Sequence, residues 1–272
     1  LIFNPDDSET AVAVGANITI TFNEKIRNTD NTALTNSNVD KLITLKDTDS
    51  DGSKIAFDAT VDPAIKVITI NPSSNFSSEQ TVYVAIGETL EDSSGNSITA
   101  TTATFNAADT TPPAISFTPH SSATGVAVNS DITIAFDEAV WNTNGTALTD
   151  ANVDKLITLK QTNSNGTNIP FDAVVNGAKR LITITTTNVF SSEQTVYLAL
   201  SATFEDASGN AIIAVSTTFT TADSTAPSVS FVPPDSSTGI PITSNVILTF
   251  DEAIRRIDNV VLTDSNVKDL IT

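Results

Sequence analysis

The sequence predicts an all-β protein made of tandem antiparallel β-sandwiches. The clearest sign is a repeat, because the motifs that begin at Phe22, Phe136 and Phe250 lie 114 residues apart (136 − 22 and 250 − 136). A period of this length corresponds to a whole domain rather than to one turn of a solenoid. Composition is the second sign: Thr, Ser, Asn, Val and Ile dominate, whereas helix-favouring Glu, Lys, Gln and Arg are sparse.

The repeat divides the chain into three units, which we call repeat 1 (residues 1–111), repeat 2 (residues 112–225) and repeat 3 (residues 226–272). The joints between them read DTTPP and DSTAP. Because proline fixes φ, we expect stiff connections that hold neighbouring repeats at a nearly constant orientation. Repeat 3 stops within a predicted strand, so we expect a truncated domain whose bare face is covered by a neighbouring molecule or by further chain.

Period-two alternation of apolar and polar residues predicts about seven strands in each complete repeat. In repeat 2 these strands include residues 131–136, 171–175, 180–185, 195–200 and 215–219. Helix-start signals at residues 149–154 predict one helix of one or two turns. Of the thirteen phenylalanines only Phe204 lacks a phenylalanine counterpart in another repeat, and it corresponds to Leu90. This equivalence predicts that the phenylalanines form the core rather than a ligand platform.

Charge and residue usage limit the classes of function. The net charge of −19 makes nucleic acid and anionic lipid surfaces unfavourable partners, whereas carboxylates suit a hard cation such as calcium. The chain has no cysteine for disulfides or thiolate sites, and its one histidine, His120, leaves no material for a catalytic triad. We therefore expect no enzyme activity, no catalytic residues and no membrane insertion. The start at Leu1 and the absence of methionine indicate a piece of a longer protein.

Residues 47–52, DTDSDG, resemble a calcium loop, because Asp47, Asp49 and Asp51 stand at alternate positions before Gly52. The same place in repeat 2 reads QTNSNG, which keeps the turn-forming residues and has none of the charges. The flanking segments predict strands, and Gly in an Asn/Asp-rich tip is also what a hairpin requires. We interpret the loop as a hairpin tip, with weak calcium binding in repeat 1 as the alternative.

The joints are the stronger calcium candidates. Asp109 and Asp223 precede the joint prolines, and Asp92 and Asp206 lie on turns expected nearby, together with the glutamates that precede them. A cation there would cancel repulsion between carboxylates and fix the angle between repeats. The alternative is that these aspartates only cap turns. The glutamates Glu24, Glu138 and Glu252, each of which follows a strand end, rank next.

Trp141 is the one tryptophan, and it replaces Arg27 of repeat 1 and Arg255 of repeat 3. We expect it on a loop, where its ring either packs over that loop or, as the candidate ligand-binding residue, stacks on a sugar.

Three motifs recur in the same order: a strand that ends in Phe-Asn/Asp-Glu, a Thr-Val-Tyr strand, and the turns EDSSGN at residues 91–96 and EDASGN at 205–210. In this order they resemble the bacterial Ig-like domains of the surface-layer type. The resemblance covers all three repeats, and its most specific element is the Asp-x-x-Gly-Asn turn. It implies tandem Ig-like sandwiches without catalytic residues of their own, and its calcium-stiffened adhesin arrays support calcium at the joints.

The resemblance implies an extracellular, cell-surface protein. We expect stalk repeats of a secreted adhesin that extend a distal binding region, with the neighbouring repeats of the same chain as partners, and surface polysaccharide or other surface proteins as further ones. Two alternatives stay open: a glycan-binding or spacer module of a secreted polysaccharide-degrading enzyme, and a subunit of a self-assembling surface layer or filament.

Overall fold

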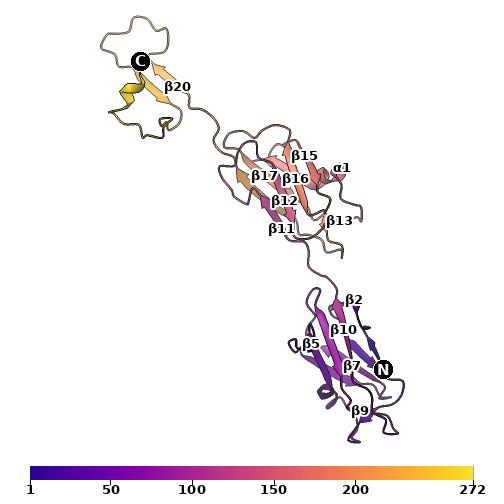
Figure 1. Cartoon of the computed structure of the whole chain (residues 1–272). Helices are drawn as coiled ribbons and strands as arrows, with labels where there is room; N and C mark the ends of the chain where they lie inside the picture. The colour runs from indigo at the N-terminus through magenta and orange to yellow at the C-terminus, as the bar shows by residue number, and fades with distance from the viewer. Residues whose placement is uncertain (272) are drawn as a thin grey trace.

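The computed structural model describes residues 1–271 and arranges them as three units in a row (Figure 1). Repeats 1 and 2 are each built from two main β-sheets with a two-stranded ribbon beside them. Most strands pair antiparallel, and the parallel pair of β2 and β10 is an exception. The predicted fold class, tandem antiparallel sandwiches, is confirmed.

Repeat 1 has one sheet with the strand order β1, β3, β7, β6 and a second with the order β2, β10, β8, β5, while β4 and β9 form the ribbon. The strands are β1 (Ile2–Asn4), β2 (Glu9–Val12), β3 (Ile18–Thr21), β4 (Arg27–Asn28), β5 (Ile43–Asp47), β6 (Phe57–Val61), β7 (Val67–Pro72), β8 (Thr81–Ile86), β9 (Leu90–Glu91) and β10 (Thr101–Ala107). A short 3-10 helix, η1 (Val39–Leu42), precedes β5.

Repeat 2 repeats this plan, with the sheets β11, β12, β16, β15 and β14, β17, β19 and the ribbon β13, β18. Its strands are β11 (Ile115–Thr118), β12 (Ile132–Phe136), β13 (Trp141–Asn142), β14 (Ile157–Gln161), β15 (Phe171–Val175), β16 (Leu181–Thr186), β17 (Thr195–Leu200), β18 (Phe204–Glu205) and β19 (Val215–Thr220). Helix α1 (Asp150–Val153) continues into η2 (Asp154–Leu156) where the sequence predicts one helix. The five predicted strands of repeat 2 agree with these bounds to within one residue.

Most phenylalanines of repeats 1 and 2 are buried in the cores of the sandwiches, as predicted, and Phe57, Phe117 and Phe171 pack against those cores partly buried. Phe105 and Phe219 occupy equivalent positions and are 0% and 2% exposed. Each packs edge-on against a second ring, Phe76 at 5.6 Å and Phe190 at 5.7 Å between centroids. Edge-to-face contact of this kind adds to the stabilisation from burial itself.

In repeat 1 the helical segment before β5 covers the edge of a sheet. β6 is an edge strand, so alternate backbone N–H groups along it have no neighbouring strand to bind. The carboxylate of Asp40 accepts a hydrogen bond from the N–H of Ala59 (2.8 Å), and the side-chain oxygen of Asn36 accepts one from Val61 (2.9 Å). Side chains that satisfy an edge in this way also keep it from pairing with another chain.

Repeat 2 has the same arrangement at its edge strand β15. Asp154 accepts from the N–H of Ala173 (2.9 Å), and Asp150 accepts from Val175 (2.8 Å). We call these side chains the edge caps of each repeat: Asn36 and Asp40 in repeat 1, and Asp150 and Asp154 in repeat 2. Their recurrence shows that side-chain hydrogen bonds to the edge strand are a regular part of the repeat unit.

Repeat 3 contributes one strand pair, β20 (Val229–Val232) with β21 (Ile247–Phe250), and the 3-10 helix η3 (Val267–Leu270). Its apolar residues are open to solvent: Phe231 is 48% exposed, whereas its counterpart Phe3 is 6% exposed. That this face is covered in the working protein stays a prediction. None of the helices within residues 1–271 has the length and apolarity that crossing a membrane requires.

Candidate cation site at the joint between repeats

The joint between repeats 1 and 2 is the linker at residues 108–114, which connects β10 to β11. Asp109 holds it in place, because Oδ1 of its carboxylate accepts hydrogen bonds from the hydroxyl of Ser78 (2.8 Å) and from the N–H of Thr111 (2.9 Å). From the side of repeat 2, the side-chain amide of Asn210 donates to the backbone carbonyl of Asp109 (3.2 Å). The linker is therefore bonded to both repeats.

The joint between repeats 2 and 3 has the same aspartate contacts. Oδ1 of Asp223 accepts from the hydroxyl of Ser192 (2.7 Å) and from the N–H of Thr225 (3.0 Å). Because two joints share these contacts, the aspartate before the prolines is a regular part of the connection between repeats.

A tight turn of repeat 2 supplies a second carboxylate to the first joint. Asp206 is 3% exposed, and its Oδ1 accepts from the N–H groups of Ser208 and Asn210, both at 2.8 Å. Its Oδ2 accepts from the side chain of Asn210 (2.7 Å). This is the Asp-x-x-Gly-Asn turn of the sequence, in which the first and last residues bind each other and fix the aspartate.

Three carboxylates meet at this joint. Asp109, Glu138 and Asp206 each offer an oxygen, and these oxygens lie within 4.8 Å of one another. No other trio of His, Cys, Asp or Glu side chains in residues 1–271 meets this condition. Calcium binds oxygen ligands at about 2.3–2.6 Å, so two ligands on opposite sides of the ion are about 5 Å apart. The donor set and the spacing therefore fit a calcium ion.

The charges at the joint act on one another. Partial burial and the neighbouring charges of Asp206 and Asp109 raise the pKa of Glu138 above its ordinary value. Hydrogen bonds from Thr111 and Ser78 lower the pKa of Asp109. Repulsion among the three carboxylates therefore mainly affects Glu138, whose pKa is raised, and a bound cation would reduce this repulsion.

The other predicted joint residues are placed differently. Asp92 closes the matching turn of repeat 1, next to β9, at the end of that repeat away from the linker (Figure 1). Asp223 has Glu252 as its neighbour, and burial together with the charge of Asp223 raises the pKa of Glu252. The repeat-3 counterpart of Asp206 would be residue 320 (206 + 114), outside the sequence.

The loop at residues 47–52 is a hairpin tip. Lys46 and Lys54 form an antiparallel bridge across it, and the equivalent Lys160 and Asn168 bridge the loop at residues 161–166. Its carboxylates serve the turn: Asp49 accepts from the N–H of Asp51 (2.8 Å), and Asp47 accepts from that of Ser53. Calcium binding by Asp47, Asp49 and Asp51 stays a prediction.

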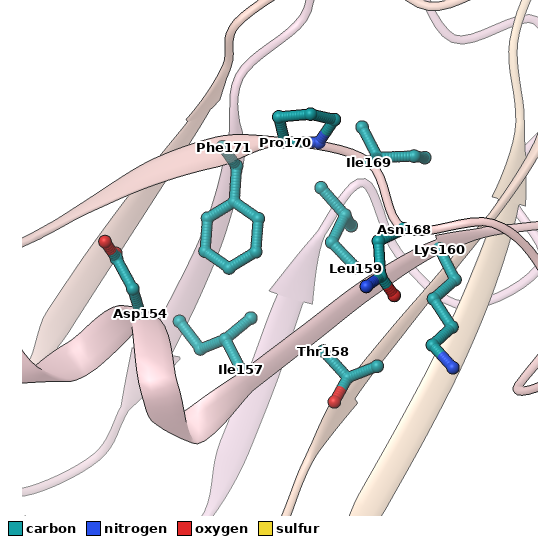
Figure 2. A pocket seen from close by; sticks show the side chains of 9 residues that line it. All are labelled: Asp154, Ile157, Thr158, Leu159, Lys160, Asn168, Ile169, Pro170 and Phe171. Carbon is teal, nitrogen blue, oxygen red and sulfur yellow. The ribbon is translucent and has the colours of Figure 1, made fainter.

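A hollow of about 420 Å³ lies where the two sheets of repeat 2 part, between β14 and the start of β15. Figure 2 shows the ring of Phe171 pointing toward Ile157, with Asp154 on the helical segment beside them. Repeat 1 has an equivalent hollow of about 340 Å³ that includes Asp40 and Phe57. Since both repeats have it, this hollow reflects how the sandwich opens and does not mark a specific site.

Trp141 lies in β13, paired with Glu205 of β18. The prediction of a loop was wrong, because these residues form a two-residue strand ribbon. Repeat 1 has the same arrangement, because Arg27 of β4 pairs with Glu91 of β9.

Sandwich modules that follow one another through short, hydrogen-bonded acidic linkers define a modular protein built from repeated domains. The chain belongs to the bacterial Ig-like domain family, whose profile matches residues 2–107 and 108–221. The resemblance drawn from the sequence motifs is therefore confirmed for repeats 1 and 2. No curated protein matches the chain in sequence.

Several solved structures are similar to parts of the chain. The N-terminal part of the bacterial S-layer protein SbsC is 14% identical over 78% of this chain and 43% of its own, with a TM-score of 0.29. The titin fragment A168–169 is 10% identical over 79% and 95%, with a TM-score of 0.29. L,D-transpeptidase 3 from Mycobacterium tuberculosis is 14% identical over 64% and 62%, with a TM-score of 0.27. Likeness at this level carries no argument about function, and the chain spans less than half of the S-layer fragment.

Proposed function

We propose that this chain is a spacer segment of a bacterial cell-surface protein, in which successive Ig-like repeats hold a distal binding region away from the cell. The observation that carries the proposal is the joint, because the same aspartate contacts recur in both linkers. Proline-containing linkers bonded to the repeats favour an extended array over a flexible tether. This role needs no catalytic residues.

We further propose that calcium binds at the joint between repeats 1 and 2 and stiffens it. Asp109, Glu138 and Asp206 would hold the ion, with Asp109 supplied by the linker and the other two by repeat 2. A metal bound by groups on both sides of a linker stabilises the arrangement in which those groups are close. Asp223 and Glu252 would supply two ligands of the same kind at the next joint.

Small-angle X-ray scattering of the full chain, in calcium and then in excess chelator, tests both proposals. A spacer predicts a rod whose longest dimension is that of three units end to end. Calcium stiffening predicts that chelation shortens or broadens the distribution of dimensions. Asp109→Asn should reproduce the effect of chelation in the presence of calcium, while Asp172→Asn, on an exposed position of β15, should not.

The outcomes separate the two proposals. A rod that is unchanged by chelation keeps the spacer function and rules out calcium as its stiffener, so that the prolines and linker hydrogen bonds suffice. A chain that is compact or freely jointed in both conditions overturns the spacer function itself. Isothermal titration of calcium into the variant Asp47→Asn/Asp49→Asn/Asp51→Asn tests the hairpin tip as a separate site.

A further inference from the structure

One surface position changes character between the repeats. In repeat 1, Arg27 of β4 forms an ion pair with Glu91 of β9: its Nε and Nη2 atoms are both 2.9 Å from Oε1 of the carboxylate. Glu91 is 8% exposed, so this carboxylate is both neutralised and largely covered. Such an arrangement leaves little of Glu91 available for another molecule.

In repeat 2 the equivalent pair is Trp141 and Glu205, which face each other in the register of β13 and β18. An indole cannot neutralise a carboxylate. Within residues 1–271, the Glu205 side chain takes part in no hydrogen bond or ion pair, and it is more exposed than Glu91. The substitution therefore places a partly exposed aromatic ring beside an unpaired carboxylate.

These two side chains line a hollow of about 440 Å³, together with Gly145 and residues 206–209. Part of the lining is the Asp206 turn, which its two backbone hydrogen bonds of 2.8 Å hold in one conformation. A preformed lining lowers the entropy that a ligand must lose together with the protein on binding.

The chemistry of the hollow selects a class of ligand. A partly exposed indole offers a flat apolar surface that suits the C–H face of a sugar ring. An unpaired carboxylate accepts strong, charge-assisted hydrogen bonds from hydroxyl groups. Glu205 and Asp206, in a chain of net charge −19, repel carboxylated or sulfated sugars. We propose that Trp141 and Glu205 form a binding subsite for a neutral sugar residue of a polysaccharide, a function beyond that of a spacer.

The chain itself provides the probe, since Trp141 is its only tryptophan and its fluorescence reports on this hollow alone. We would titrate the full chain with maltohexaose, cellohexaose and chitohexaose, and with oligogalacturonate as the anionic comparison. A single subsite of this kind predicts a saturable fluorescence change with a Kd of about 1 mM for at least one neutral sugar, and none for oligogalacturonate. No response to any neutral sugar at about 20 mM, or a response to the anionic one alone, would overturn the proposal.

Variants separate binding from folding. Trp141→Arg recreates the Arg27–Glu91 pair, so repeat 2 should fold as repeat 1 does, and circular dichroism checks this. In affinity electrophoresis through gels with glycogen, hydroxyethyl cellulose or galactomannan, retardation of the chain should be lost in Trp141→Arg. It should weaken about tenfold in Glu205→Gln. Retardation that survives Trp141→Arg would contradict the proposal.

The converse substitution is a gain-of-function test. Arg27→Trp should free Glu91 and give repeat 1 a second subsite, which increases retardation relative to the unmodified chain. None of these measurements depends on the length of the rod, so the sugar site and the spacer function are tested separately. Asp206 also belongs to the proposed calcium site, so the sugar titrations are made in excess chelator.

Discussion

Repeats 1 and 2 share one backbone plan but differ in the chemistry of their turns. The hairpin tip at residues 47–52 contains three aspartates, whereas residues 161–166 contain none, and both make the same bridge between strands. In both, the glycine lies directly against the backbone oxygen of the residue that opens the loop. The comparison teaches that the hairpin tip depends on backbone geometry, because the same bridge and the same glycine contact form with three aspartates in the loop and with none.

The same comparison also locates specialised positions. Where Asp62 of repeat 1 becomes Asn176 of repeat 2, two of the three hydrogen bonds to the side chain are kept, and the one from the N–H of Ala64 is not. Where Trp141 of repeat 2 replaces Arg27 of repeat 1, the ion pair is lost and an aromatic ring lies opposite the carboxylate. Exchanges that abolish an interaction therefore deserve experiments before exchanges that preserve it.

The largest expected effect comes from the glycines at the hairpin tips. A Cβ at Gly52 would lie 1.7 Å from the carbonyl oxygen of Asp47, and one at Gly166 would lie 1.6 Å from that of Gln161. Gly52→Ala and Gly166→Ala should each destabilise their own repeat by about 1–3 kcal/mol. Hydrogen exchange measured by mass spectrometry in denaturant reports each repeat separately.

Gly177→Ala is the matched control, because nothing lies within 4 Å of a Cβ added there. If Gly52→Ala lowers stability and Gly166→Ala does not, the comparison fails. That result would mean that the stability of the first hairpin tip depends on its charged residues rather than on its backbone geometry.

An effect of intermediate size is expected at the edge caps. Asp154→Ala leaves the N–H of Ala173 without its partner, which should cost about 1 kcal/mol and expose the edge of the sheet. The double variant Asp150→Ala/Asp154→Ala should therefore self-associate in sedimentation velocity. Asp40→Ala should act likewise in repeat 1, and Asp172→Ala, an exposed residue of the same strand β15, is the control. Monomers at every concentration would mean that the caps stabilise the strand without protecting it.

The smallest effect concerns acid stability. Backbone hydrogen bonds from Val67 and Lys66 lower the pKa of Asp62 below its ordinary value of 3.8. The carboxyl group of Asp62 therefore binds fewer protons in the folded protein than in the unfolded chain. The resulting stabilisation is fully present above the pKa that Asp62 has in the unfolded chain. It is lost as the pH falls through the lower pKa that Asp62 has in the folded protein. Asn176 of repeat 2 does not titrate. Repeat 1 should thus lose more protection against hydrogen exchange than repeat 2 between about pH 5 and pH 3.

Asp62→Asn should remove part of that difference, because it gives repeat 1 the side chain that repeat 2 already uses. Asp58→Asn, on an exposed position of the edge strand β6, should leave it unchanged. If Asp62→Asn does not alter the pH dependence of the stability of repeat 1, then the exchange of aspartate for asparagine between the two turns does not contribute to that pH dependence.

The repeat spacing and the alternation of residues were enough to predict the sandwich, the strands of repeat 2 and the phenylalanine core. These features depend on local pattern and on burial, which a sequence expresses directly. The edge caps were not foreseen, because Asp40 and Ala59 are 19 residues apart and Asn36 and Val61 are 25 residues apart. Which loop reaches which strand edge is decided by the topology of the sheets.

The joint was predicted in part for the same reason. Asp109 and Asp206 were both candidates, and the structure brings them together with Glu138. Asp92 was also expected at a joint after its own repeat, but its turn lies at the opposite end of the sandwich. Local sequence identifies a turn as such, whereas the end of the domain at which it lies depends on how many times the chain crosses the sheets.

The three-carboxylate joint is divided between neighbours, with one member at the tail of a repeat and two at the head of the next. Repeat 2 therefore carries both halves of a connector, with Glu138 and Asp206 at its head and Asp223 at its tail. Duplication or deletion of a 114-residue block would leave all remaining connections intact. Related genes can then encode molecules that differ in length by whole repeats, without any compensating substitution elsewhere.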